Sequence, residues 1–187
     1  ARMSRLRYVS HKIFDGVPEV KGMPHARGGG RTLAVTLKDD CSSLETILHY
    51  TVWDESNVLV RNAEYVNAGK ESVVLEKAYS FCCDLPEGDY SLLRLWGHWA
   101  RERYPETVPL GHGVTRLQSL RGASSHQMNP FTALLAKDCA EEHGECYGVQ
   151  LIYSGSFALT AEKSPVDTVR LQGGIQDIGF SMQLGGG

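Results

Sequence analysis

The chain has 187 residues and a mass of 20.6 kDa, with 42% hydrophobic and 22% charged residues and a net charge of −3. A chain of this size buries roughly 70% of its unfolded surface on folding, so one domain with its own core is expected. The isoelectric point near 6.2 excludes a strongly basic nucleic-acid-binding domain, and high apolar content with low net charge excludes a disordered chain.

Alternation of apolar and polar residues with a period of two predicts strands along most of the chain. In chain order the expected strands cover residues 33–38, 47–53, 58–66, 73–82, 90–95, 114–120, 147–153, 157–162, 168–172 and 180–184. Short polar turns separate them. Only residues 131–139 fit a short helix, and within them residues 132–135 fit a buried strand equally well. The pattern predicts an all-β, antiparallel sandwich in a single domain.

The cysteines indicate a reducing compartment. Five of them, an odd number, do not fit the paired framework of a small secreted protein, and adjacent Cys82 and Cys83 point to opposite faces of a strand. No signal sequence and no apolar run of about 18 residues is present. We therefore expect a cytoplasmic protein without membrane partners, although a chain beginning at Ala1 could be cut from a longer gene that hides a leader.

Two polar stretches, 96–113 and 121–130, interrupt the strand pattern and are longer than hairpin loops, which makes them candidates for function. In the first, indole rings suit the apolar C–H faces of a sugar, while Arg101 and Glu102 suit its hydroxyls. Trp96 and Trp99 are three residues apart, so a strand places them on opposite faces, one in the core and one exposed. The alternative is that one tryptophan belongs to the core and the Arg-Glu-Arg run 101–103 is a solvated surface.

The other candidate chemistry is weaker. The stretch 121–130 contains the residue types of a hydrolase triad, Ser125, His126 and Asn129, but not the Gly-x-Ser-x-Gly motif around the serine. We therefore expect a loop whose side chains form hydrogen bonds with its own backbone. Cys139, His143 and Cys146 lack a fourth zinc ligand, so no metal site is predicted. Glycines 28–30 lack the lysine and serine of a phosphate-binding loop. No spacing identifies the carboxylate pair of a glycosidase among Glu102, Asp138, Glu141, Glu142 and Glu145.

Several long motifs carry a resemblance to a known family. They are residues 6–16, 84–90, 97–102, 121–131 and 144–148, followed in order by 153–157, 174–175 and Phe180. Together they closely resemble the N-terminal domain of bacterial α-galactosidases of glycoside hydrolase family 36. The resemblance implies a β-supersandwich packed on a catalytic (β/α)₈ barrel, in a retaining enzyme that cleaves terminal α-galactosides such as melibiose or raffinose.

The same resemblance implies that this chain is inactive alone. Neither motif of the two catalytic aspartates occurs here, and the family's domain begins upstream of Leu6, so residues 1–187 are expected to be a fragment without the barrel, truncated on its N-terminal side. The expected partners are that barrel, an α-galactoside and further copies of the full-length protein. No cofactor and no nucleic acid is expected.

The resemblance also assigns site residues. Trp99 matches a tryptophan that lines the galactose pocket at a domain or subunit boundary. Arg101 and Glu102 match the same motif and are expected to be orienting residues. The chain departs from the family at Trp96, commonly a small residue, and at Met128, commonly histidine. The alternatives are a free-standing carbohydrate-binding module and a purely structural or oligomerisation domain.

Overall fold

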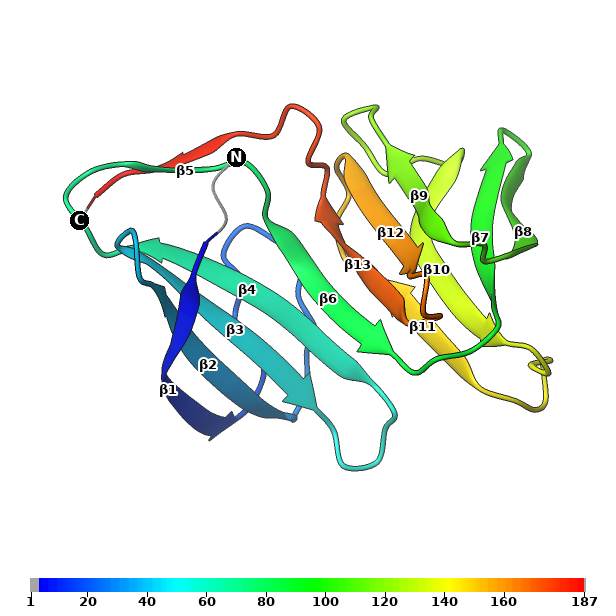
Figure 1. Cartoon of the computed structure of the whole chain (residues 1–187), viewed down its shortest axis with the longest axis horizontal. Coiled ribbons are helices and arrows are strands. Elements are labelled where there is room, and N and C mark those ends of the chain that lie inside the picture. The colour runs from blue at the N-terminus through cyan, green and yellow to red at the C-terminus, as the bar shows by residue number, and fades with distance from the viewer. Residues whose placement is uncertain (1–3, 187) are drawn as a thin grey trace. The chain divides into compact units, whose positions relative to one another are not determined.

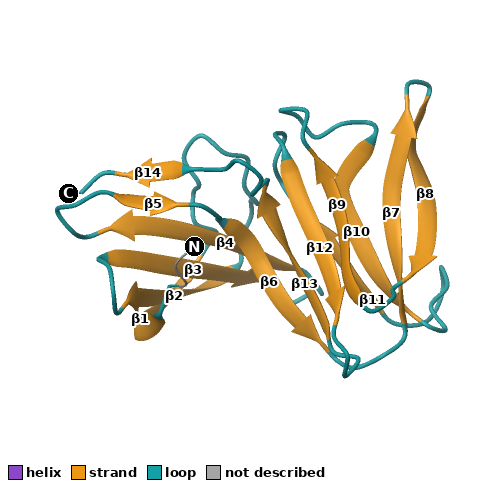
Figure 2. Ribbon diagram, turned by 45° about the horizontal axis from the view of Figure 1, so that its top comes forward, coloured by secondary structure: helices purple, strands orange, loops and turns teal. Residues whose placement is uncertain are grey.

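The computed structural model describes residues 4–186, which form fourteen strands and no helix (Figures 1 and 2). The contacts divide the chain into two compact units. The first unit comprises the residues up to Phe81 and those from Ile178 onward, and the second comprises Cys82–Asp177. The prediction of one domain over residues 1–187 stays a prediction, and residues 1–3 and 187 lie outside the described part. Within that part, no helix is available that could cross a membrane.

The first unit is built on an antiparallel meander. Its four strands are consecutive in the chain and adjacent in the sheet, in the order β1 (Leu6–Asp15), β2 (Arg31–Asp39), β3 (Leu44–Val52) and β4 (Leu59–Asn67). A separate ribbon pairs β5 (Val73–Leu75) with β14 (Met182–Leu184), so the unit's two segments of chain are joined by strand pairing. The Asn67 side chain reinforces this closure, because its amide donates to the carbonyl oxygen of Leu184 at 3.1 Å.

The second unit contains two four-stranded antiparallel sheets. One has the order β11-β10-β7-β8 and the other the order β6-β13-β12-β9. The first of these sheets consists of β7 (Tyr90–His98), β8 (Arg101–Pro109), β10 (Met128–Ala136) and β11 (Cys146–Gln150). The second consists of β6 (Tyr79–Leu85), whose residues up to Phe81 are counted with the first unit, β9 (Gly113–Ser119), β12 (Phe157–Lys163) and β13 (Val169–Ile175).

The core of the second unit is supplied by both of its sheets. Leu92 on β7 pairs directly with Leu134 on β10, and both are almost fully buried. From the other sheet come Phe157, with 0% of its surface exposed, and the equally buried Leu159 and Leu171. Two sheets that bury apolar faces in this way form a β-sandwich. The predicted all-β antiparallel fold is confirmed.

Most predicted strands are present. The structure corrects two expectations and decides between strand and helix for a third stretch. Within the stretch 131–139, residues 131–136 belong to strand β10, and residues 137–139 follow it without forming a helix. The expected strand 73–82 is two strands, β5 and β6, because the chain leaves the ribbon with β14 and enters the sheet beside β13. The stretch after Trp96, predicted to be irregular, contains the nine-residue strand β8. Its prolines Pro105 and Pro109 are tolerated because β8 is the edge of its sheet.

Candidate functional site

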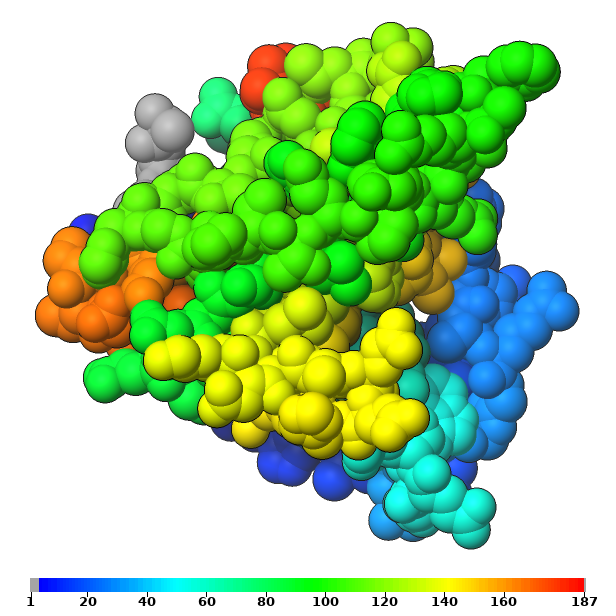
Figure 3. Space-filling view, turned by 90° about the vertical axis from the view of Figure 1, so that its right-hand side faces the viewer, coloured from blue at the N-terminus to red at the C-terminus, as the bar shows by residue number. Residues whose placement is uncertain are grey.

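The β7–β8 hairpin carries the predicted site at its tip (Figure 1, upper end of β7), and it forms much of the face seen in green in Figure 3. Trp99 occupies the turn, with 83% of its surface exposed. Trp96 lies lower on β7, half-buried, with its ring 5.7 Å from that of Tyr104 in an edge-to-face arrangement. The two tryptophans therefore differ in exposure as the sequence predicted, although Trp96 is only partly in the core.

The backbone of the tip has an unusual conformation. Ala100 and Arg103 adopt positive φ angles of 63° and 56°, which residues other than glycine rarely do. The register shifts between Trp96 and His98, and His98 pairs with Arg101 to close the hairpin. Gly97 lies within this irregularity, where a Cβ atom would overlap the carbonyl oxygen of Arg101. The close approach of the two strands therefore requires glycine at this position.

Glu102 holds the turn through its carboxylate. One oxygen, Oε1, accepts a hydrogen bond from the Ala100 backbone N–H at 2.9 Å. Hydrogen bonds from the backbone of Glu102 itself and from Ala100 lower the pKa of this carboxyl, and the nearby His126 and His98 add to the effect. Glu102 is thus placed where it can fix the backbone beside Trp99.

The other side chains of the tip act around the turn. Nδ1 of His98 donates to the carbonyl oxygen of Trp99 at 2.7 Å. The guanidinium of Arg101 lies over the ring of Tyr104 on the same strand, 4.2 Å from its centroid. Tyr104 in turn pairs with Trp96 across the hairpin, and the two rings are in contact. The structure brings Glu102, and not Arg101, into direct contact with the turn. Tyr104 was missed by the sequence reasoning, although an aromatic residue five positions after Trp99 was a visible signal.

The second polar stretch behaves as a loop with internal hydrogen bonds. Ser119 donates to the Ala123 carbonyl oxygen at 2.6 Å, and the hydroxyl of Ser125 accepts from the Gln127 backbone N–H at 2.9 Å. Among residues 4–186, no serine side chain is hydrogen-bonded to His126. These contacts agree with the predicted role of the loop side chains in holding its backbone.

The cysteine–histidine cluster was the remaining candidate. Cys139 lies near Cys146, and burial together with Cys139 raises the pKa of the Cys146 thiol. In the described part of the chain, no three His, Cys, Asp or Glu side chains gather as a metal site would require. Nothing in the geometry of these residues points to catalysis.

Comparisons with known proteins decide the family. The model of the glycosyl hydrolase family 36 N-terminal domain matches residues 1–185. The chain belongs to this family.

Relatives of known name agree with the assignment. The chain is 40% identical over 183 residues to the α-galactosidase AgaA of Geobacillus stearothermophilus, covering 96% of this chain and 25% of that protein. It is also 40% identical to the α-galactosidase Mel36A of Lactobacillus acidophilus, with the same coverage, and 34% identical to α-galactosidase 2 of Hypocrea jecorina, covering 99% of this chain and 25% of that protein. The chain thus spans about a quarter of the length of these relatives.

Solved structures show the same relationship. The crystal structure of AgaA superposes with a TM-score of 0.96 at 39% identity, over 100% of this chain and 27% of that one. A variant of AgaA in complex with raffinose superposes with a TM-score of 0.96 at 40% identity, over 99% of this chain and 26% of that one. The galactosidase domain of the α-galactosidase–sucrose kinase AgaSK gives 0.95 at 36% identity, over 98% and 26% of the two chains.

Proposed function

We propose that this chain is a non-catalytic part of a retaining α-galactosidase, and that it supports the catalytic barrel and contributes Trp99 to sugar binding. The family match over residues 1–185 and the α-galactosidase relatives support the parent activity. The observation that carries the role of Trp99 is its 83% exposure on a turn that Gly97 and Glu102 hold in one conformation.

The proposed chemistry of Trp99 is the stacking of its indole ring on the apolar C–H face of a terminal galactose. A single exposed ring buries little of a sugar, whereas ligand sites cover most of their ligand's surface. The opposite wall and both catalytic carboxylates must therefore come from outside this chain, and the proposed source is the barrel of the same protein. Glu102 acts by orienting the turn, and Arg101 acts only indirectly, through Tyr104.

The proposal extends to partners and location. The full-length protein would act on α-galactosides such as raffinose or melibiose, assemble into homo-oligomers and work in the cytoplasm. No cofactor is needed for hydrolysis by two carboxyl groups.

The test is Trp99→Ala in the full-length protein encoded by the gene, with raffinose as substrate. Losing an aromatic contact worth about 1 kcal/mol should raise KM roughly fivefold and leave kcat nearly unchanged. Trp99→Phe serves as the control, because it keeps an aromatic face and should recover most of the affinity.

Three results would contradict the proposal. Hydrolysis of a chromogenic α-galactoside by the purified 187-residue chain would place catalytic groups within it. Calorimetric binding of raffinose to the chain alone, lost in Trp99→Ala, would favour a free-standing carbohydrate-binding module. An unchanged KM in the full-length Trp99→Ala protein would leave the chain a packing scaffold.

A further inference from the structure

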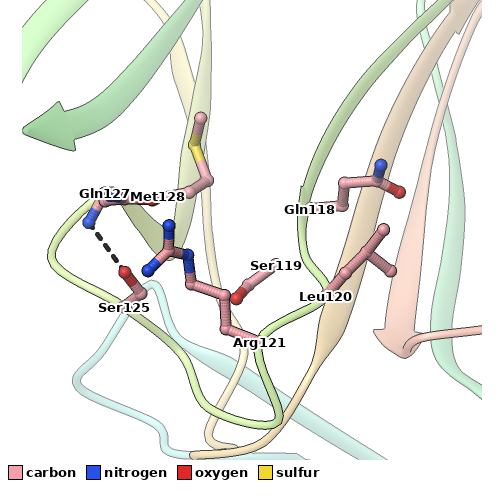
Figure 4. A pocket seen from close by; sticks show the side chains of 7 residues that line it. All are labelled: Gln118, Ser119, Leu120, Arg121, Ser125, Gln127 and Met128. Carbon is pink, nitrogen blue, oxygen red and sulfur yellow. Dashed lines mark hydrogen bonds between the residues drawn. The ribbon is translucent and has the colours of Figure 1, made fainter.

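A pocket lies in the second unit where β9 ends and β10 begins. Its volume is about 240 Å³, and Figure 4 shows the side chains that line it. Its lining comes from one short stretch of sequence and comprises Gln118, Ser119, Leu120, Arg121, Ser125, Gln127 and Met128.

Some polar groups of this lining are already engaged in holding the fold. The side-chain oxygen of Gln118 accepts from Nε of Arg116 at 2.7 Å and from Nε2 of Gln176 at 3.3 Å. The hydroxyl of Ser119 donates its proton to the carbonyl oxygen of Ala123. These two residues therefore build the wall with the Gln118 side-chain oxygen and the Ser119 hydroxyl proton, and the Gln118 amide N–H groups remain as donors.

The remaining polar groups are mostly unused donors. Within residues 4–186, the Arg121 guanidinium makes no hydrogen bond and no ion pair, and Figure 4 shows it directed toward the segment that carries Gln127 and Met128. Ser125 accepts a hydrogen bond from the Gln127 backbone, so its own hydroxyl proton remains free to donate. The Gln127 side chain adds an amide N–H, and no carboxylate lines the pocket.

The surplus of donors selects the ligand. A neutral sugar hydroxyl donates as well as accepts, whereas the one charged side chain of the pocket, Arg121, only donates. An oxyanion accepts only, and the guanidinium fork matches its geometry and its charge. Leu120 and Met128 provide an apolar surface for the organic part that carries the anionic group.

We propose that this pocket binds the oxyanion group, phosphate or carboxylate, of a small organic molecule, with Arg121 as its ion-pair partner. Ser125 and Gln127 donate to the remaining oxygens. Trp99 is not among the residues that line this pocket.

The experiment is an NMR titration of the ¹⁵N-labelled 187-residue chain with inorganic phosphate and, separately, with acetate, each against sodium chloride of equal ionic strength. We expect saturable shifts of the Ser125 and Gln127 amides and of the Arg121 Nε–H for at least one anion. Saturation by phosphate alone identifies a phosphate ester as the ligand class, and saturation by acetate alone identifies a carboxylate. Galactose serves as a neutral arm and should produce no saturable shift.

Two variants sharpen the test. Arg121→Gln removes the charge and should weaken anion binding about tenfold. Lys137→Gln removes an equally exposed positive charge of the same unit outside the pocket and should leave the affinity unchanged. Absence of saturable shifts with both anions in the unmodified chain, equal affinity in Arg121→Gln, or saturation by galactose would each overturn the proposal.

Discussion

Replacing Gly97 by alanine should open the tip of the β7–β8 hairpin. The new Cβ would overlap the Arg101 carbonyl oxygen and would lie 3.0 Å from the Arg101 carbonyl carbon and 3.1 Å from Cα of Glu102. Ordinary contacts of this kind are 3.4–4 Å, and all three obstacles are backbone atoms that cannot rotate away. The opposing strand must therefore retreat by several tenths of an ångström or more.

The cost follows from that displacement. Inserting a methyl group into a well-packed site typically costs about 1–3 kcal/mol. Because the fully buried side chains of the sandwich, such as Leu92 and Leu134, belong to other parts of the sheet, the hairpin tip should absorb the strain by local opening. We expect the free energy of unfolding to fall by about 1–2 kcal/mol in urea denaturation. Amide hydrogen exchange should accelerate at the tip and stay unchanged at Leu134.

Gly148→Ala is the matched control. It introduces the same methyl group into the same sheet, on β11, where the nearest atom is Cε2 of Phe131 at an ordinary 4.0 Å. Its free energy of unfolding should change by no more than about 0.5 kcal/mol. The steric reasoning fails if Gly97→Ala is as stable as this control and shows unchanged amide shifts at the tip.

Three further predictions concern stability and titration. Phe157→Ala should lower the free energy of unfolding by about 3–5 kcal/mol, while truncation of Val166, which is 69% exposed, should have almost no effect in the same urea assay. The carboxylate of Asp84 accepts two hydrogen bonds from Arg170, at 2.6 and 2.9 Å, and this contact lowers the pKa of Asp84. The ion pair therefore stabilises the fold at any pH above the unfolded-state pKa near 3.8. That stabilisation is lost as the pH falls through the lower pKa of the folded state. Asp84→Asn should accordingly flatten the loss of stability below about pH 4, and an acid limb identical to that of the unmodified chain would contradict this. The Glu102 carboxyl should titrate below the ordinary glutamate pKa of 4.5 when followed by ¹³C NMR, and a midpoint at or above that value would mean that its backbone hydrogen bonds are not formed in solution.

The sequence predicted the interior strands well because they obey simple rules. Strands such as β12 and β13 are paired on both sides in their sheet, and short polar turns mark the ends of such elements. The two missed strands, β1 and β8, are edges of their sheets, and nearly all of their residues are exposed. A strand with solvent on most sides needs no alternation and tolerates proline, so its sequence carries little signal.

The site was predictable in part, for comparable reasons. The spacing of Trp96 and Trp99 predicted that they differ in exposure through strand alternation, but Trp99 is exposed because it lies in the turn and not on the strand. The positive φ angles at Ala100 and Arg103 were not predictable, because neither residue type favours that conformation. The need for Gly97 depends on how closely β8 approaches, which only the paired structure shows.

The conformation of the β7–β8 hairpin tip lowers the free energy of unfolding of this chain. A left-handed conformation costs roughly 1–2 kcal/mol for a residue with a side chain, and both Ala100 and Arg103 adopt one. Trp99 regains little of that cost through burial, since 83% of its surface is exposed. Trp99→Ala should therefore leave the free energy of unfolding of the chain within about 0.5 kcal/mol of its original value, while raising KM in the full-length protein. A large loss of stability in the isolated chain would show instead that Trp99 serves the fold, and the proposed sugar contact would lose its main structural support.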